Sequence, residues 1–250
     1  MQIKLDRIAF INEFLMPLNK IVGDDDINKG CIIDITNQSA SSICNTKDNS
    51  IILYANMNIS TGLDEKGETH LNIFDIRKFI RLLECIQEKE VILKINSNNL
   101  TYKSNNINFK FHLMDDGVIR KSPINVAKIS NLTFQNEFSM SKSKLDELMR
   151  VSGFAEDSNK LYLSCVNNGI RGELTDKTKP NIDNVDIQIA ESYIGNNFNN
   201  IPISLDVFRK LSGIKFDLIN IKVNVETKIL LMELISNNCV LKYVASALVK

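Results

Sequence analysis

Residues 72–96, NIFDIRKFIRLLECIQEKEVILKIN, decide the fold of this chain. Their apolar members recur at the spacing that keeps one face of a helix buried, namely Ile76, Phe79, Ile80, Leu83 and Ile86. Arg77, Lys78 and Arg81 fall on the opposite face, and a short β-type run, 91–95, follows almost at once. The stretch therefore predicts an amphipathic helix with a basic outer face that leads into a strand.

The same pattern returns about one domain length later. Residues 204–213, SLDVFRKLSG, precede a second strand-like run at 219–225. Both copies read Asp, a branched aliphatic residue and then an Arg-Lys pair. Cations on the outer face of a helix are usually only a solvated surface, and Glu84, Glu88 and Glu90 dilute the first set. Because the basic helix occurs twice in the chain, a binding function for these charges is favoured over a merely solvated surface.

The composition is that of a globular protein without bulk charge. The 250 residues are 44% hydrophobic, and 30 Lys and Arg balance 30 Asp and Glu. Any affinity for nucleic acid must therefore come from segregation of charge. No apolar run approaches the roughly 18 to 20 residues that span a bilayer, and Asp6, Arg7 and Glu13 interrupt the N-terminal segment, which excludes a secretory signal. We expect no membrane contact and a cytoplasmic location.

The chain reads as two similar halves, each β-α-βββ-α-βββ. In the first helix the apolar stripe from Ile8 to Val22 contains Pro17, which should kink or split it. Residues 115–128 have no sustained period and contain Gly117 and Pro123. The sequence predicts an α+β fold of two similar domains, 1–114 and 129–250, joined by the linker 115–128. The second domain should resume as a strand over 129–139.

The sequence contains no recognisable catalytic arrangement. His70 and His112 each lie in a β-type run without a nucleophile motif, and no GxSxG, GxxxxGK[ST], HExxH or GxGxxG occurs. Residues 24–28, DDDIN, resemble a calcium loop, but Lys29 stands where Gly is required and Ile35 where Glu is required. We expect no catalytic site, no metal and no cofactor, and hence a binding protein.

The cysteines are odd in number and form no CxxC pair, which favours reduced and mostly buried thiols. They are Cys31, Cys44, Cys85, Cys165 and Cys239.

The duplicated plan resembles the DNA sliding clamps, the processivity factors of replicative polymerases. Residues 145–152, LDELMRVS, with the strand 161–166 and Asn168-Gly169-Ile170, are similar to the start of the second domain in clamps of tailed bacteriophages. The closing 241–245, LKYVA, resembles the last strand of proliferating cell nuclear antigen. The plan covers essentially the whole chain, whereas these motifs are short and only moderately specific.

The resemblance implies a homotrimeric ring in which strands form an outer layer and helices line the central hole. Lys and Arg on those helices then face the phosphates of duplex DNA, with contacts that carry no base information. A neutral protein can bind DNA in this way if its acidic residues lie on the outer sheet, more than a Debye length of about 8 Å from the DNA, where salt screens their repulsion. Helix position gives these DNA-binding candidates: Arg7, Lys20, Arg77, Lys78, Arg81, Lys142, Lys144, Arg150, Arg209, Lys210 and Lys215. The first helix departs from the pattern, since it is poor in cations and carries Pro17.

Two further surfaces follow from the resemblance. Subunits in such rings join by pairing of edge strands, here 107–114 and 185–190, which places Phe109, Phe111, Ile187 and Ile189 near the seam. The alternative is that these four are ordinary core residues. Partner peptides dock under the linker beside the C-terminal segment, which implicates Val118, Ile119, Val126, Val244, Ser246 and Ala247.

The function implied is a viral DNA-replication protein of bacteriophage type, acting in an infected bacterial host. It would encircle duplex DNA, tether the DNA polymerase and be placed on DNA by a clamp loader, with no enzymatic activity. One alternative is a monomeric or dimeric processivity subunit of the same fold that grips DNA on an open face. Another is a non-enzymatic β-rich viral structural protein whose helix charges are merely solvating.

Overall fold

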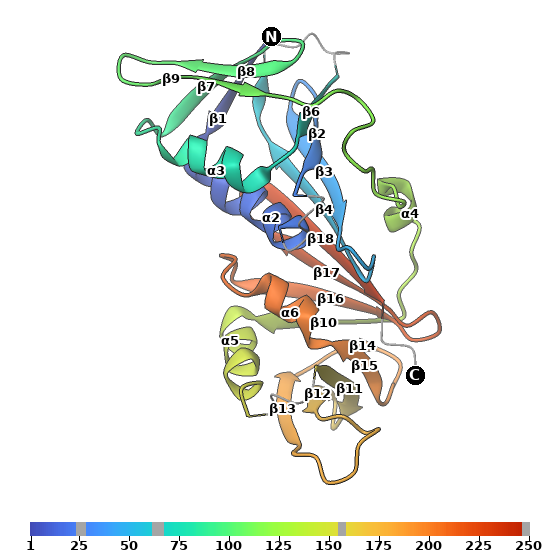
Figure 1. Cartoon of the computed structure of the whole chain (residues 1–250). Coiled ribbons are helices and arrows are strands. Elements are labelled where there is room, and N and C mark those ends of the chain that lie inside the picture. Colours follow the sequence, from blue (N-terminus) through green and yellow to red (C-terminus); the bar gives the residue numbers. More distant parts are fainter. Residues whose placement is uncertain (24–28, 62–67, 155–158, 247–250) are drawn as a thin grey trace. The chain divides into compact units, whose positions relative to one another are not determined.

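The computed structural model describes residues 1–23, 29–61, 68–154 and 159–246 (Figure 1). The chain divides into two compact units. Unit 1 comprises residues 1–128 with 236–241, and unit 2 comprises 129–235 with 242–250. The segment 24–28, compared above with a calcium loop, and Ala247 lie outside the described residues.

Unit 1 combines two antiparallel sheets with helices. Strands β5 (Ser60–Thr61), β1 (Gln2–Asp6), β7 (Glu90–Ile95), β8 (Asn99–Lys103) and β9 (Asn108–His112) follow one another in that order in one sheet. The second has the order β4 (Ile51–Asn58), β3 (Ser39–Asn45), β2 (Cys31–Ile35) and β6 (Thr69–Ile73). The helical segments are α1 (Arg7–Ala9), η1 (Phe10–Leu15), α2 (Met16–Val22) and α3 (Ile76–Glu84).

Unit 2 repeats this plan. One set of strands has the order β14 (Ile194–Gly195), β10 (Asn136–Ser141), β16 (Leu218–Asn224), β17 (Ile229–Ile235) and β18 (Cys239–Ser246). The other has the order β13 (Val185–Ala190), β12 (Gly169–Leu174), β11 (Lys160–Val166) and β15 (Ile201–Ser204). Its helices are α5 (Lys142–Val151) and α6 (Leu205–Leu211). Strands, helices and strand orders correspond between the units, which confirms the predicted α+β fold with two similar domains.

Among the described residues, each unit has two more strands than the sequence reading found. One is a two-residue strand, β5 or β14, and the other is β6 or β15. Strands β6 and β15 stand directly before α3 and α6. Both lie at the end of their strand order, and β15 contains Pro202. An edge strand tolerates proline because the missing amide hydrogen need not serve a neighbour on both sides. A short run that contains proline gives a weak strand signal, so β15 was missed.

The first helix changes its hydrogen-bond register before Pro17. Asp6 caps its start by accepting a hydrogen bond from the Ala9 amide at 3.0 Å. Pro17 has no amide hydrogen, and the preceding segment, η1, is a π-helix in which the Met16 amide donates to the Ile11 carbonyl. Pro17 then lies at the start of α2. The predicted kink or split is therefore a π-helical segment within an unbroken helical run.

The predicted strand over 129–139 begins later than expected. Residues Val126–Ser130 form a short helix, α4, and β10 starts only at Asn136. The Asn125 side chain accepts a hydrogen bond from the Lys128 amide at 3.0 Å, which caps the first turn. The prediction that Ile129 starts a strand was wrong because this local cap outweighed the β-type composition.

Helix α3 buries the face that the periodicity predicted. Ile76, Phe79, Ile80 and Leu83 are buried, and the Asp75 side chain caps the helix by accepting from the Lys78 amide at 2.8 Å. The Phe79 ring lies 5.0 Å, centroid to centroid, from the ring of Phe111 in β9. The apolar face thus ties α3 to the sheet, which leaves the basic face exposed.

We predict that Phe79→Ala lowers the free energy of unfolding by about 3–5 kcal/mol, because it removes a fully buried ring and leaves a cavity. Urea unfolding of the full chain measures this. Arg77→Ala on the exposed face is the control and should change stability by less than about 0.5 kcal/mol. Equal losses for the two variants would contradict the packing described for α3.

Candidate functional site

The cations of α3 form an exposed and unpaired group. Arg77, Lys78 and Arg81 are all exposed. Within the described parts of the chain, no carboxylate lies within ion-pairing distance of any of the three side chains. Their charges are therefore not neutralised locally, and this face of unit 1 can attract an anion.

The cations of α5 are largely paired with acidic residues of the same helix. Lys142 Nζ lies 2.5 Å from Asp146 Oδ1, and Lys144 Nζ lies 2.8 Å from Glu147 Oε2. These pairs have the i,i+4 and i,i+3 spacing of helix-surface ion pairs. Arg150, in the last turn, is exposed.

Helix α6 also holds its Arg within a polar network. Arg209 Nη1 donates to Asp206 Oδ1 at 2.8 Å and to Asn159 Oδ1 at 2.6 Å. Although burial opposes it, hydrogen bonds from Arg209 and Asn159 lower the pKa of Asp206. The carboxylate therefore stays ionised at neutral pH and keeps Arg209 engaged. Lys210 is half-buried in the same helix.

The two Arg-Lys pairs do not occupy matching positions. Asp75 is the N-cap of α3, so Arg77 lies in the first turn. In α6 the N-cap is Ser204 and Asp206 lies inside the helix, so Arg209 belongs to the last turn. Counted from the caps, Arg81 corresponds to Lys210, and Phe79 to Phe208. The helices are repeated, but the prediction that their Arg-Lys pairs match was wrong in register.

The remaining DNA-binding candidates occupy less exposed or non-helical positions. Arg7 is half-buried, and its Nε donates to the Glu88 carbonyl at 2.8 Å. Lys20 is half-buried in α2. Lys215 is exposed but follows α6 in the turn before β16, so its assignment to a helix was wrong.

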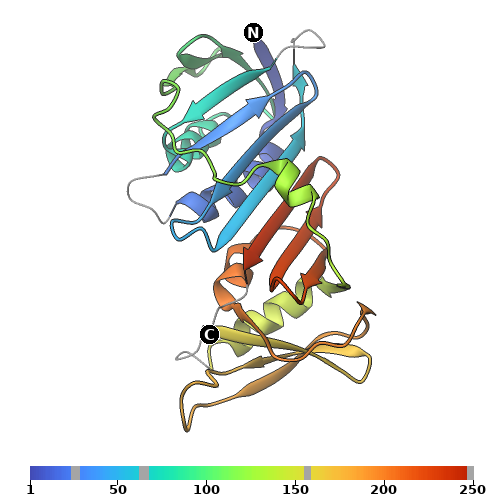
Figure 2. The same cartoon turned by 90° about the vertical axis from the view of Figure 1, so that its right-hand side faces the viewer.

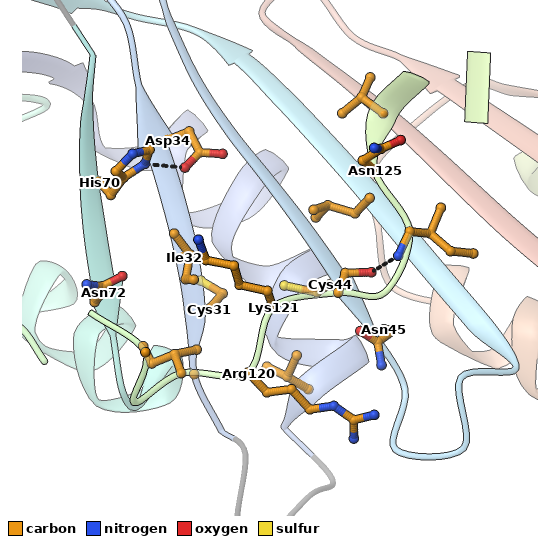
Figure 3. A pocket seen from close by; sticks show the side chains of 18 of the residues that line it. Cys31, Ile32, Asp34, Cys44, Asn45, His70, Asn72, Arg120, Lys121 and Asn125 are labelled. Carbon is orange, nitrogen blue, oxygen red and sulfur yellow. Dashed lines mark hydrogen bonds and ion pairs between the residues drawn. The ribbon is translucent and has the colours of Figure 1, made fainter. Parts of the chain in front are cut away.

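A cavity of about 560 Å³ lies in unit 1 between the outer face of the β2 sheet and the segment 116–126 (Figure 3). Figure 2 shows this segment, in green, crossing the blue strands. Ile32 and Ile43 contribute apolar side chains from the strands, and Ile119 and Ile124 contribute them from the segment. Arg120 and Lys121 also line the cavity. It combines apolar walls with cationic and amide groups, as peptide-binding pockets do.

The predicted peptide-binding residues are only partly in this cavity. Ile119 and Val126 line it, whereas Val118 is 53% exposed and outside the lining. In unit 2, Val244 is buried and Ser246 exposed. The strand residues Ile32 and Ile43 were missed, because alternation along a β-strand shows that a side chain faces outward but not what covers it.

Asn72 anchors the chain that enters this segment. Its buried side chain donates to the Met114 carbonyl at 3.2 Å and to Asp116 Oδ1 at 2.8 Å. The Met114 amide donates in turn to the Asn72 carbonyl at 3.0 Å. One amide side chain in β6 thereby fixes the first residues of the cavity wall.

The four predicted seam residues lie on the terminal strands of their sheets but point inward. Strand β9 ends one strand order and β13 ends another. Phe111, Ile187 and Ile189 are buried, and Phe109 is half-buried against Tyr102 with ring centroids 5.5 Å apart. Phe111, Ile187 and Ile189 are therefore core residues, which was the alternative stated above, whereas the place of all four near a subunit seam stays a prediction. What these strands expose is Lys110 and His112 on β9 and Asp186 and Gln188 on β13.

A second cavity, of about 510 Å³, lies between α3 and β9 in unit 1. Phe74, Leu82, Phe111 and Met114 contribute its apolar lining, and Lys78, Arg81 and Lys110 lie at the same site. In unit 2, Phe154 directly follows the last turn of α5 and is 81% exposed. Sequence reasoning singled out neither feature, since an exposed apolar residue at a helix end has no periodic signal.

Solved structures of DNA sliding clamps share this fold. PCNA of A. fulgidus bound to the C-terminal region of FEN-1 has a TM-score of 0.76 at 15% identity, over 100% of this chain and 98% of that chain. The proliferating cellular nuclear antigen of Entamoeba histolytica has a TM-score of 0.73 at 14% sequence identity, over 99% of this chain and 98% of that chain. The DNA polymerase sliding clamp of Bacillus subtilis has a TM-score of 0.73 at 15% sequence identity, over 100% of this chain but only 64% of that chain. No family model and no curated protein matches the sequence.

The chain thus has the fold of the DNA sliding clamps, which confirms the resemblance seen in the sequence. More particularly, it matches PCNA from end to end on both sides of the comparison. Among the described residues, no helix is long and apolar enough to cross a membrane.

We predict that Asn72→Ala speeds trypsin cleavage after Arg120 and Lys121, because it releases the residues that enter the cavity wall. Mass spectrometry of timed digests measures the cleavage rate at these two sites. The control is Asn45→Ala, which removes another amide lining the cavity that does not hold residues 114–116. Equal rates in the wild type and the Asn72 variant would contradict the anchoring role.

Proposed function

We propose that this protein is a sliding clamp that encircles duplex DNA and tethers a replicative DNA polymerase, with no catalytic activity of its own. The observation that carries the proposal is the clamp fold over the whole chain together with an unpaired basic face on α3. The proposal includes the linker 115–128 between domains 1–114 and 129–250, a clamp loader as partner, and a bacteriophage source with action in the infected host's cytoplasm.

The placement of Arg77 and Lys78 supports a role in phosphate binding. Both lie in the first turn of α3, where the helix dipole disfavours a cation by about 0.3–1 kcal/mol. Helix stability therefore does not account for them. A phosphate placed near them would gain from charge-assisted contacts with both side chains, while Asp75 already caps the helix end itself. Such contacts are independent of sequence, as a sliding protein requires.

The remaining cations contribute unequally under this proposal. Lys142, Lys144 and Arg209 must exchange a carboxylate partner for a phosphate, so their net gain is smaller than that of the α3 group. Arg150 and Lys215 are exposed and complete the proposed surface. Arg7, Lys20 and Lys210 are half-buried and contribute through long-range attraction more than direct contact.

The cavity between the β2 sheet and residues 116–126 is the proposed docking site for partner peptides. Its apolar walls fit an apolar anchor residue, and Arg120 and Lys121 fit an acidic flank. The solved complex of a PCNA with the C-terminal region of FEN-1 supports a peptide-binding role for this fold. We retain Ile119 and Val126 with Val244, Ser246 and Ala247 as candidates, and we replace Val118 by Ile32 and Ile43.

We further propose that three copies close a ring through the edges of β9 and β13. Lys110 on one edge and Asp186 on the other are of opposite charge, and a head-to-tail pairing would let Lys110 join the ion pair that Asp186 makes with Arg171 at 2.9 Å. The cavity beside β9 would receive Phe154 of the next copy, since both expose apolar surface and α5 packs against β13. Burial of Phe154 would add an apolar contact to the strand pairing.

We predict that the triple variant Arg77→Ala, Lys78→Ala, Arg81→Ala weakens binding to duplex DNA and makes the slope of log Kobs against log salt less negative by about 2 to 3, because each phosphate contact contributes about −0.9. Fluorescence anisotropy over a salt series measures it, and clamp-dependent product length should shorten. Lys142→Ala with Lys144→Ala is the control, with a smaller expected change because these cations are ion-paired. An unchanged slope in the triple variant would count against the DNA-lining role.

We predict a mass in solution of three times 28.3 kDa for the wild type and a shift toward the monomer for Phe154→Ala, because the ring that would fill the cavity of the next copy is lost. Light scattering at several concentrations measures both. The control is Ile235→Ala, which shortens another apolar side chain of unit 2, 72% exposed, and should leave the mass unchanged. A wild type that is monomeric or dimeric but still binds DNA would support the alternative of an open-face processivity subunit. A wild type that shows no salt-dependent DNA binding would support the alternative of a viral structural protein.

A further inference from the structure

Three side chains with metal-binding atoms converge on the outer face of the β2–β6 ladder. Asp34 in β2 and His70 in β6 are direct cross-strand partners, and Asp34 Oδ1 lies 2.7 Å from His70 Nδ1. Glu68 precedes His70 by two residues, and residues i and i+2 of an extended chain point to the same side. One donor atom from each of the three lies within 4.8 Å of the other two.

We propose that Asp34, Glu68 and His70 bind a divalent transition-metal ion such as Zn²⁺ or Mn²⁺. These ions accept imidazole nitrogen and carboxylate oxygen at about 2.0–2.2 Å, which places neighbouring ligand atoms about 3–3.5 Å apart. The donor atoms, which lie within 4.8 Å of one another, must therefore approach by at most about 1–2 Å. The side chains of His70 and Asp34 are 53% and 38% exposed, so they can rotate without disturbing the core.

The charge and the donor type narrow the choice of ion. Two carboxylates balance a divalent cation, whereas the two together without a cation repel each other. An imidazole ligand disfavours Ca²⁺ and Mg²⁺, which prefer oxygen. Three protein ligands leave further coordination positions for water, as in open metal sites.

The backbone holds the donors in place. Five cross-strand pairs, from Cys31–Ile73 to Ile35–Thr69, fix the register of β2 against β6. Ile33 and Ile35 flank Asp34 in sequence and are fully buried, so the strand beneath the site cannot shift without disrupting the core. This pre-organisation is what a metal site needs.

The site lies at the rim of the cavity described above, because Asp34 and His70 both belong to its lining (Figure 3). Besides Asp34, the charged groups lining the cavity are three cations, Lys47, Arg120 and Lys121, and one carboxylate, Asp116. A bound ion would neutralise the carboxylates that otherwise offset these cations. The expectation of no metal site was based on spacing motifs, which cannot reveal ligands from two strands. The inference does not depend on DNA binding.

Isothermal titration of the full chain, stripped of metal with EDTA, tests the proposal with ZnCl₂ and MnCl₂ as probes. Every variant carries Cys85→Ser so that this exposed thiol cannot bind Zn²⁺. We expect one ion per chain with a dissociation constant below about 10 μM, and at least tenfold weaker binding in His70→Ala, Asp34→Asn and Glu68→Gln. His112→Ala, which removes the other histidine, exposed on β9, should bind as the parent does.

Two further outcomes decide the question. A rise in melting temperature with Mn²⁺ in the parent and in His112→Ala, but not in His70→Ala, would support the site, because an ion that binds only the folded state stabilises it. Binding only in the millimolar range, or binding that is unchanged in His70→Ala, would overturn it. Because Asp34→Asn and Glu68→Gln keep the shape of exposed side chains, loss of binding in them reflects lost ligands rather than unfolding.

Discussion

The structure depends on the burial of one apolar helix face against strands in each unit. Phe79 in α3 and Phe208 in α6 stand four residues after their helix N-caps, and both are fully buried. A ring in this position orients the helix about its own axis, because the remaining apolar residues must lie on the same side. The opposite side is then left to polar and charged residues. The face available for binding is therefore a by-product of packing.

Packing decides where charges can lie, and local pairing decides which of them are available. Within the described residues the α3 cations form no ion pair, although Asp75 and Glu84 lie in or next to the same helix, whereas Lys142 and Lys144 of α5 and Arg209 of α6 are each paired with a carboxylate one turn away. Exposed ion pairs contribute little to stability, but they weaken the field that a distant phosphate experiences. A neutral chain can thus present one strongly basic helix.

The segment 116–126 turns an open sheet face into a cavity. A sheet with one polar face would normally be solvated, yet here Ile32 and Ile43 face outward beneath this segment. Asn72 holds the segment where it leaves the sheet. The same sheet face carries the proposed ligands Asp34 and His70. One covered face thereby places a peptide-sized cavity and a candidate metal site side by side.

The amino-acid sequence by itself determined the α+β class, the duplication and the apolar face of α3. These follow from interactions within a few residues, which periodicity records. Only the tertiary structure decided that the Arg-Lys pairs differ in register, that Phe109 and Phe111 point inward, and that Asp34 meets His70. Those facts depend on which strands become neighbours, and strand pairing joins residues that are far apart in the chain and share no local signal.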